Sequence, residues 1–318
     1  MERLTTGVLL ALGAGLLWGF VFVAPQLMPS FGPVEVALGR YFFYGVFSAG
    51  LLVAWGLRRS GGESLLTTGK KAWPLALAFA FSGNLGMYLL LVVGIRFAGA
   101  PVATPLIGTI PVMVAIAGNL IEREFPWRRL ALPLVLILPG LLAINLTGAG
   151  TGAPAGEGRY LGLLCTFGTV GLWTFYGVAN GRFLKANPSV SGSAWSTIVG
   201  VATLVLVFLA VPLVALLVPG AVGFGQLLHP NARLAWFVAA SAFLGVAVSW
   251  GGTLLWNGAS TRLPTALAGQ LVVSEIVAGL FYVFVADARF PSVLELAGVL
   301  AVVFGVLVGV RRTSASYR

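Results

Sequence analysis

Charged residues are so widely spaced along this chain that its apolar stretches are long enough to cross a lipid bilayer. Residues 4–34 contain no charged residue, whereas about 20 apolar residues already span the hydrocarbon core as a helix. Lipid offers no partner to an unpaired backbone group, so only helices or closed barrels cross it. The period-two alternation of barrel strands is absent. The pattern therefore predicts an all-α integral membrane protein.

Ten transmembrane helices are predicted when the chain is read between charged residues, prolines and loop signals. We expect them at residues 5–26, 34–57, 73–95, 99–121, 130–147, 160–182, 191–218, 234–257, 263–286 and 292–310. The N-terminus, alternate connections and the C-terminus carry 14 Lys and Arg residues, whereas the opposite connections carry 4. The positive-inside rule therefore predicts a multi-pass protein with both termini in the cytoplasm.

The second half of the chain repeats landmarks of the first half in the same order. At a spacing of 155 residues, Trp18, Pro33 and Gly45 match Trp173, Pro188 and Gly200, and at a spacing of 165, Phe125-Pro126 and Gly140 match Phe290-Pro291 and Gly305. We expect residues 1–150 and 151–318 to form two five-helix repeats. Because five is odd, the second repeat is inverted in the membrane, an arrangement typical of secondary transporters with a substrate site near the midplane.

Composition excludes several other classes of protein. Hydrophobic residues make up 58% of the chain and charged residues 9%, against about 25% charged residues in soluble domains. The net charge of +10 comes from short loops rather than one face, which argues against nucleic-acid binding. Cys165 and His229 are the single residues of their kinds, so neither a metal site nor another cofactor is expected. The sequence contains no phosphate-binding loop motif, so ATP-driven transport is not expected.

The first span contains the sequence Gly-Leu-Leu-Trp-Gly-Phe from Gly15 to Phe20. With ten spans arranged as 5+5 and the late Phe-Pro-then-Gly pattern, the chain resembles the drug/metabolite transporter superfamily of the EamA type over nearly its whole length. Within that superfamily it looks most like the bacterial aromatic amino acid exporters of the inner membrane. The resemblance implies a basket of helices around a central cavity, with spans 1–4 and 6–9 lining it and spans 5 and 10 at the periphery.

Two charged residues lie well inside predicted spans, namely Arg40 and Glu275. Charge within a membrane is costly, so it marks a functional candidate. The two residues have similar predicted depths, which makes pairing possible. Arg40 is expected to hold a substrate carboxylate, and Glu275 an ammonium group or a coupling proton. In the alternative, Arg40 reaches out to the interface and Glu275 joins helices by hydrogen bonds.

Polar and aromatic residues at helical spacing indicate faces that avoid lipid. In the sixth span such a face comprises Thr169, Trp173, Tyr176 and Asn180. Trp18 and Trp173 lie near the middle of their spans, where an indole N–H needs a partner away from lipid. Other tryptophans near span ends are expected in the interfacial belts: Trp55, Trp73, Trp127, Trp195 and Trp236.

These patterns give a set of candidate substrate-binding residues and a set of candidate hinge residues. The substrate-binding candidates are Trp18, Arg40, Tyr44, Asn84, Tyr88, Trp173, Tyr176, Trp250, Gln270, Ser274 and Glu275. The hinge candidates are Pro101, Pro105, Pro111 and Pro264, because proline kinks a helix or frees carbonyl groups.

The function expected from these residues is secondary transport that exports aromatic and other neutral amino acids across the bacterial inner membrane by alternating access. Its partners are then a small-molecule substrate and the lipid bilayer. The same residues permit export of other small metabolites or drugs, such as purines or sugar-like compounds. An intramembrane enzyme would need a catalytic constellation, which is not visible, and a purely structural or receptor-like bundle does not predict an inverted duplication. Proton coupling, facilitated diffusion and the oligomeric state stay open.

Overall fold

The computed structural model describes residues 2–57, 72–148, 158–217, 223 and 231–314. Within these ranges no strand occurs, and ten helical spans are long and apolar enough to cross a membrane. The spans cover residues 2–27, 33–56, 72–98, 102–122, 127–144, 159–186, 192–216, 232–260, 265–286 and 293–312. The prediction of an all-α fold with ten transmembrane helices is confirmed.

The first five spans contain the elements of the first repeat. They are α1 (Glu2–Leu27), α2 (Pro33–Leu57), residues 72–80 continued by η1 (Phe81–Leu85) and α4 (Gly86–Ala98), then α5 (Ala100–Gly108) with α6 (Ile110–Glu122), and α7 (Trp127–Gly148). The last five spans follow the same plan. They are α8 (Arg159–Ala186), α9 (Gly192–Leu217), α11 (Ala232–Phe243) with η2 (Leu244–Gly251) and α12 (Gly252–Ser260), then α13 (Thr265–Leu271) with α14 (Val273–Ala286), and α15 (Val293–Ser314).

Irregular backbone recurs at equivalent places in the two halves. The third and eighth spans each contain a π-helical segment, η1 and η2, and the fourth and ninth spans are each divided, at Thr109 and Val272. Among the described residues, the non-glycine residues with positive φ are Arg123 (51°) and Ala288 (49°). Their spacing of 165 equals that of the two Phe-Pro pairs. These irregularities support two copies of one five-helix unit, and the expected boundary at residues 150/151 lies outside the described residues.

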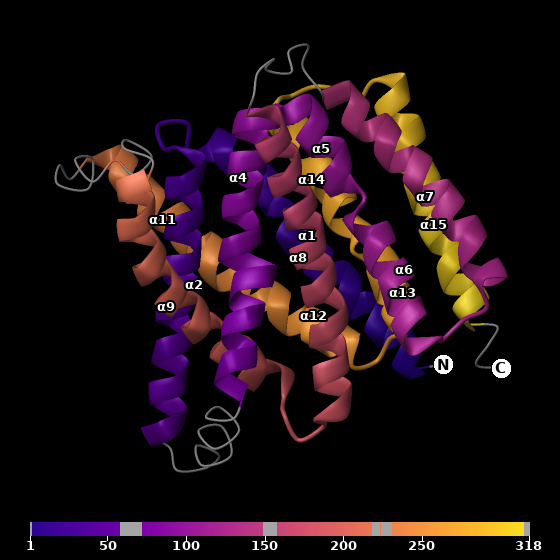
Figure 1. Ribbon diagram of the computed structural model, residues 1–318, viewed down its shortest axis with the longest axis horizontal. Helices are drawn as coiled ribbons and strands as arrows, with labels where there is room; N and C mark the ends of the chain where they lie inside the picture. The colour runs from indigo at the N-terminus through magenta and orange to yellow at the C-terminus, as the bar shows by residue number, and fades with distance from the viewer. Residues whose placement is uncertain (1, 58–71, 149–157, 218–222, 224–230, 315–318) are drawn as a thin grey trace.

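Equivalent spans of the two repeats pack against each other. Contacts join α2 with α9, α6 with α13, and α7 with α15. The α7–α15 pair lies along one edge of the bundle (Figure 1). A Cβ added to Gly140 would lie 2.7 Å from the carbonyl oxygen of Gly298, and one added to Gly305 would lie 3.1 Å from that of Pro133. The two contacts are related by the spacing of 165, as expected for an inverted pair, and small residues allow this close approach.

The two repeats also interlock at the centre of the molecule. Helix α1 packs against α14 and α12, and α4 packs against α8. A Cβ added to Gly19 would lie 2.8 Å from the Cβ of Ala278, so the α1–α14 contact depends on a missing side chain. The first helix of each repeat therefore packs against helices of the other repeat.

Both termini lie at the same end of the bundle, at the bottom in Figure 1. We call this end the terminus face and the other end the opposite face. An even number of spans requires this arrangement. The positive-inside rule predicts that the terminus face is cytoplasmic, and this remains a prediction.

One expected belt tryptophan lies in the interior instead. Trp127 and Trp236 are 48% and 55% exposed, as an interfacial position requires, but Trp195 is fully buried. Its indole N–H donates to the Asn180 side chain at 2.8 Å, and Asn180 in turn donates to Asn257 at 2.9 Å. The belt assignment of Trp195 is wrong because these buried amide groups give its indole a polar partner inside the protein.

Candidate functional site

Seven of the ten spans line a cavity of about 440 Å³, and none of its described lining residues belongs to spans 5, 7 or 10. The expectation that span 7 is among the lining spans is therefore wrong. This volume lies in the range of small-molecule sites, roughly 300–1,000 Å³. On α1 the lining runs from Trp18 to Pro25, and on the third span it extends to Ile95, near the end of α4. The cavity therefore extends from the middle of the bundle towards the opposite face.

Aromatic rings form the inner end of the cavity. Trp18 and Trp173 meet edge to face with ring centroids 6.3 Å apart, and Tyr176 lies 5.9 Å from Trp173. All three line the cavity, while Trp256 packs against both indoles at 5.7 and 6.2 Å and is itself buried. Edge-to-face packing suits the ring quadrupoles, so the rings give an apolar substrate group a stiff surface.

Opposite charges face the same cavity without forming an ion pair with each other. Arg40 and Glu275 both line it, and no salt bridge joins these two described residues. Arg40 donates from Nε to the Ser249 hydroxyl at 2.7 Å, and its guanidinium lies 5.1 Å from the ring centroid of Tyr41. This second contact is in the range of cation–π attraction. A guanidinium held in this way can bind a carboxylate through its remaining N–H groups.

The two π-helical segments bring polar side chains to the site. Asn84 lies in η1 and lines the cavity, and its amide donates to Thr203 at 3.1 Å. Ser249 lies in η2, 165 residues later, and donates to the carbonyl of Leu244 at 2.9 Å. Short π-helical segments inside α-helices are frequent at functional sites. At matching positions, the first repeat thus supplies the lining residue Asn84, and the second supplies Ser249, which holds the lining residue Arg40.

Seven of the candidate substrate-binding residues line the cavity: Trp18, Arg40, Asn84, Tyr88, Trp173, Tyr176 and Glu275. They come from spans that are far apart in sequence. Tyr88 also donates its hydroxyl to the carbonyl of Pro33 at 3.2 Å. A role in substrate binding remains a prediction for all seven.

Four other candidates lie outside the cavity lining. Tyr44 is fully buried and donates to the Ser196 carbonyl at 2.9 Å, and Trp250 donates to the Thr197 hydroxyl at 3.1 Å. Both side chains join α9 to its neighbours. Ser274 and Gln270 also lie off the lining: the Ser274 hydroxyl donates to the Leu271 carbonyl at 2.7 Å, and Gln270 packs beside Gly309 of α15. For these four, substrate contact remains a prediction that needs another conformation.

The hinge candidates cluster around the two divided spans. Pro101 is in the first turn of α5, with its side chain outside the described part of the structure; Pro105 lies inside α5; Pro111 lies at the start of α6; and Pro264 caps α13. Pro111 also lines the cavity. The breaks at Thr109 and Val272 lie where movement of half-helices is expected, but hinge motion remains a prediction.

Several lining residues were not singled out from the sequence, notably Tyr41, Met87 and Thr104. Tyr41 directly follows Arg40, and a one-face periodicity does not select neighbouring positions. Thr104 lies between prolines that were interpreted as hinges, and Met87 has no polar group. Thr253 of the eighth span also lines the cavity and was not selected as a candidate.

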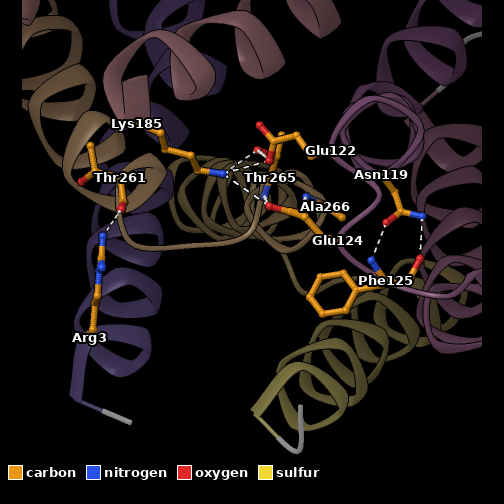
Figure 2. A network of polar contacts seen from close by, with 9 residues as sticks. All are labelled: Arg3, Asn119, Glu122, Glu124, Phe125, Lys185, Thr261, Thr265 and Ala266. Carbon is orange, nitrogen blue, oxygen red and sulfur yellow. Dashed lines mark hydrogen bonds and ion pairs between the residues drawn. The ribbon is translucent and has the colours of Figure 1, made fainter. Parts of the chain in front are cut away.

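Polar contacts join neighbouring spans and connections at the terminus face (Figure 2). Arg3 donates to the carbonyl of Thr261 at 2.9 Å, which joins α1 to the end of the eighth span. Asn119 exchanges two hydrogen bonds with the backbone of Phe125, at 3.0 and 2.9 Å, and thereby shapes the connection from α6 to α7. In that connection, burial and the neighbouring Glu122 raise the pKa of Glu124.

No group of three or more His, Cys, Asp or Glu residues suited to a metal ion occurs among the described residues.

Inverted repeats around a cavity at mid-depth, with charged groups facing it, define the class of polytopic membrane transporters.

Comparison with known proteins gives the family. The EamA-like transporter family matches residues 5–146. The chain is 34% identical to the inner membrane protein YtfF of Escherichia coli (strain K12), over 96% of this chain and 95% of that protein. The chain belongs to the EamA-like transporter family.

A solved structure supports the same fold. A crystal structure described only as "Crystal structure of protein" superposes with a TM-score of 0.73 and 18% sequence identity, over 96% of each chain. At this identity the likeness concerns the fold alone.

Proposed function

We propose that this protein exports aromatic and other neutral amino acids across a bacterial inner membrane by alternating access. The observation that carries the proposal is the cavity that contains Arg40, Glu275 and the Trp18–Trp173 pair together. A neutral amino acid has a carboxylate, an ammonium group and an apolar side chain, and each finds a complementary group there. The inner-membrane location is supported by the relative YtfF.

The positions of these groups support one orientation of the substrate. The carboxylate would bind Arg40, the ammonium group would bind Glu275, and the side chain would lie against the indoles at the inner end. Asn84 and Tyr88 would add hydrogen bonds along the wall. Alternating access would then move the two interlocked repeats relative to each other around this fixed site.

The test is flux into or out of liposomes that contain the purified protein, with a panel of aromatic, aliphatic, acidic and basic amino acids, purines and sugar-like compounds. Saturable flux is expected for neutral amino acids, with the aromatic ones preferred. Arg40→Met should abolish it, whereas Arg96→Met, which removes an exposed arginine from the opposite face, serves as the matched control. Absence of saturable flux for every neutral amino acid would reject the proposal, and flux of purines or sugar-like compounds alone would favour that alternative.

A further inference from the structure

One lysine on the terminus face joins groups from both repeats. Lys185, at the end of α8, places its ammonium 3.0 Å from Glu122 and 3.4 Å from Glu124, which belong to the first repeat. The same ammonium donates to the hydroxyl of Thr265 at 2.9 Å, at the start of α13. Figure 2 shows Lys185 between the two carboxylates and Thr265. We call Glu122, Glu124, Lys185 and Thr265 the terminus-face cluster.

The carboxylates of the cluster also hold the backbone of the second repeat. Glu124 accepts hydrogen bonds from the N–H groups of Thr265 and Ala266 at 2.9 and 3.2 Å, and Glu122 accepts one from the Thr265 hydroxyl at 2.7 Å. Two orphan N–H groups at the start of α13 are satisfied in this way. Side chains of Glu122 and Glu124 are only 16% and 18% exposed, so solvent screens these contacts less than an ordinary surface pair.

Among the described residues, the equivalent segment on the opposite face shows no such bridge between the repeats. Asp287 and Arg289 stand 165 residues after Glu122 and Glu124, around the matching positive-φ residue. Arg289 pairs with Glu295 at 2.8 Å and lies 3.7 Å from Asp287. These contacts stay within residues 287–295 of the second repeat. Among the described residues, the ion pairs that cross between the repeats therefore lie on the terminus face, whereas the cavity extends towards the opposite face.

We infer that the terminus-face cluster is the gate that keeps this end of the transporter closed while the cavity is accessible from the opposite face. Access from the terminus face requires α13 and the end of α8 to part from the connection between α6 and α7. This movement breaks every contact of Glu122 and Glu124 with Lys185, Thr265 and Ala266 at once. The inference rests on the alternating-access part of the proposed function, but not on the identity of the substrate.

The experiment measures the gate without substrate. Spin labels are placed at Arg128 and Ala186, exposed residues on the two sides of the cluster, and in a second sample at Arg96 and Phe290 on the opposite face. The single native cysteine is replaced by Cys165→Ser, and distances are recorded by pulsed electron paramagnetic resonance in lipid nanodiscs. Lys185→Met is expected to raise the ratio of long to short distances on the terminus face about tenfold, since several hydrogen bonds to charged groups are lost. The opposite-face distance should shorten in step.

Two variants serve as controls. Arg289→Met removes a positive charge and an ion pair that does not cross between repeats, so the terminus-face distances should stay as in the parent protein. Lys185→Arg keeps the charge and should restore the short distance. Should Lys185→Met misfold, Glu124→Gln tests the same gate from the other repeat.

The outcomes separate this inference from the substrate proposal. Unchanged terminus-face distances in folded Lys185→Met and Glu124→Gln proteins overturn the gate, whatever the flux assay shows. A shifted distance in a protein that moves no amino acid supports the gate and rejects only the amino acid substrate.

Discussion

At the scale of single residues, the proposed site divides substrate recognition between charged groups on the wall and aromatic rings at the inner end. Burial of the Trp18 and Trp173 rings, 8% and 7% exposed, keeps their orientation fixed by contact with Trp256. Selectivity for apolar side chains should therefore depend on these rings more than on the charged residues, which recognise groups common to all amino acids.

Replacement of either indole tests this separation. Trp18→Ala or Trp173→Ala should raise the half-saturating concentration of aromatic amino acids about two- to tenfold, since an aromatic pair contributes roughly 0.5–1.5 kcal/mol beyond burial. Aliphatic amino acids should be affected less. Trp127→Ala, at an exposed position, is the control, and equal losses for aromatic and aliphatic substrates would contradict the assigned role. Concentration-dependent flux in liposomes provides the measurement.

Glu275 offers a second test at this scale. If it carries a coupling proton, Glu275→Gln cannot titrate and should abolish flux driven by a pH gradient while leaving substrate exchange partly intact. Flux with and without an imposed gradient, and counterflow at equal pH, distinguish the two activities. An unchanged response to the gradient in the variant would exclude Glu275 as the proton carrier and leave facilitated diffusion as the simpler mechanism.

Each residue that sequence reasoning found, misplaced or missed has its own physical explanation. Arg40 and Glu275 were identified because a charge in an apolar stretch is costly wherever it faces. Trp195 was misplaced because its position near a span end suits a belt, and only the fold shows that Asn180 reaches its indole. Tyr41 was missed because its side chain carries no signal distinct from that of any interfacial tyrosine.

At the scale of elements, the π-helical segments and helix breaks place the cavity wall. The lengths of the spans were predictable from hydrophobicity, but the divisions at Thr109 and Val272 were not. A proline signals a possible break without saying how neighbouring helices will accommodate it. The π turns of η1 and η2 were likewise not predictable, and neither were the contacts of Asn84 with Thr203 and of Ser249 with Arg40, which join these turns to other spans.

Close contact between η1 and α8 leads to a prediction about substrate size. A Cβ added to Gly83 would lie 2.6 Å from the ring of Tyr176, and both residues line the cavity. Gly83→Ala should push the ring inward and reduce transport of tryptophan about fivefold or more, since overpacking costs roughly 1–3 kcal/mol. Transport of alanine should change less.

A matched control comes from Gly171, where an added Cβ meets no atom within 4 Å. Gly171→Ala should leave both transport rates near those of the parent protein. Equal loss of tryptophan and alanine transport in Gly83→Ala would indicate damage to the fold rather than a narrower cavity. Thermal denaturation in detergent reports on that damage independently.

At the scale of the whole molecule, the duplication was visible in sequence because matched landmarks keep their order, and the structure shows what they do. Gly45 and Gly200 meet where α2 crosses α9: a Cβ on Gly45 would lie 3.1 Å from the Gly200 carbonyl. Which face has the ion pairs between the repeats was not predictable. The equivalent connections at residues 122–124 and 287–289 both contain charged residues, and only the fold shows which partners these residues reach.

Orientation in the membrane is the prediction that belongs to this scale. Both termini should be cytoplasmic, as the distribution of basic residues requires. In a Cys165→Ser background, a cysteine at Ala186 should resist membrane-impermeant thiol reagents in intact cells and react after permeabilisation. A cysteine at Phe290, which is 94% exposed, should react in intact cells. The reverse pattern would contradict the assigned orientation.

The two connections with positive φ have diverged in chemistry while keeping one shape. One carries Glu122 and Glu124, and the other carries Asp287 and Arg289. A carrier built from identical halves would rest equally in either direction. If the proposed gate holds, the bias is encoded at the rims of this protein, far from the proposed substrate site. Evolution can thus retune the resting preference of such a protein, or its turnover, by exchanging a few loop charges and leaving recognition untouched.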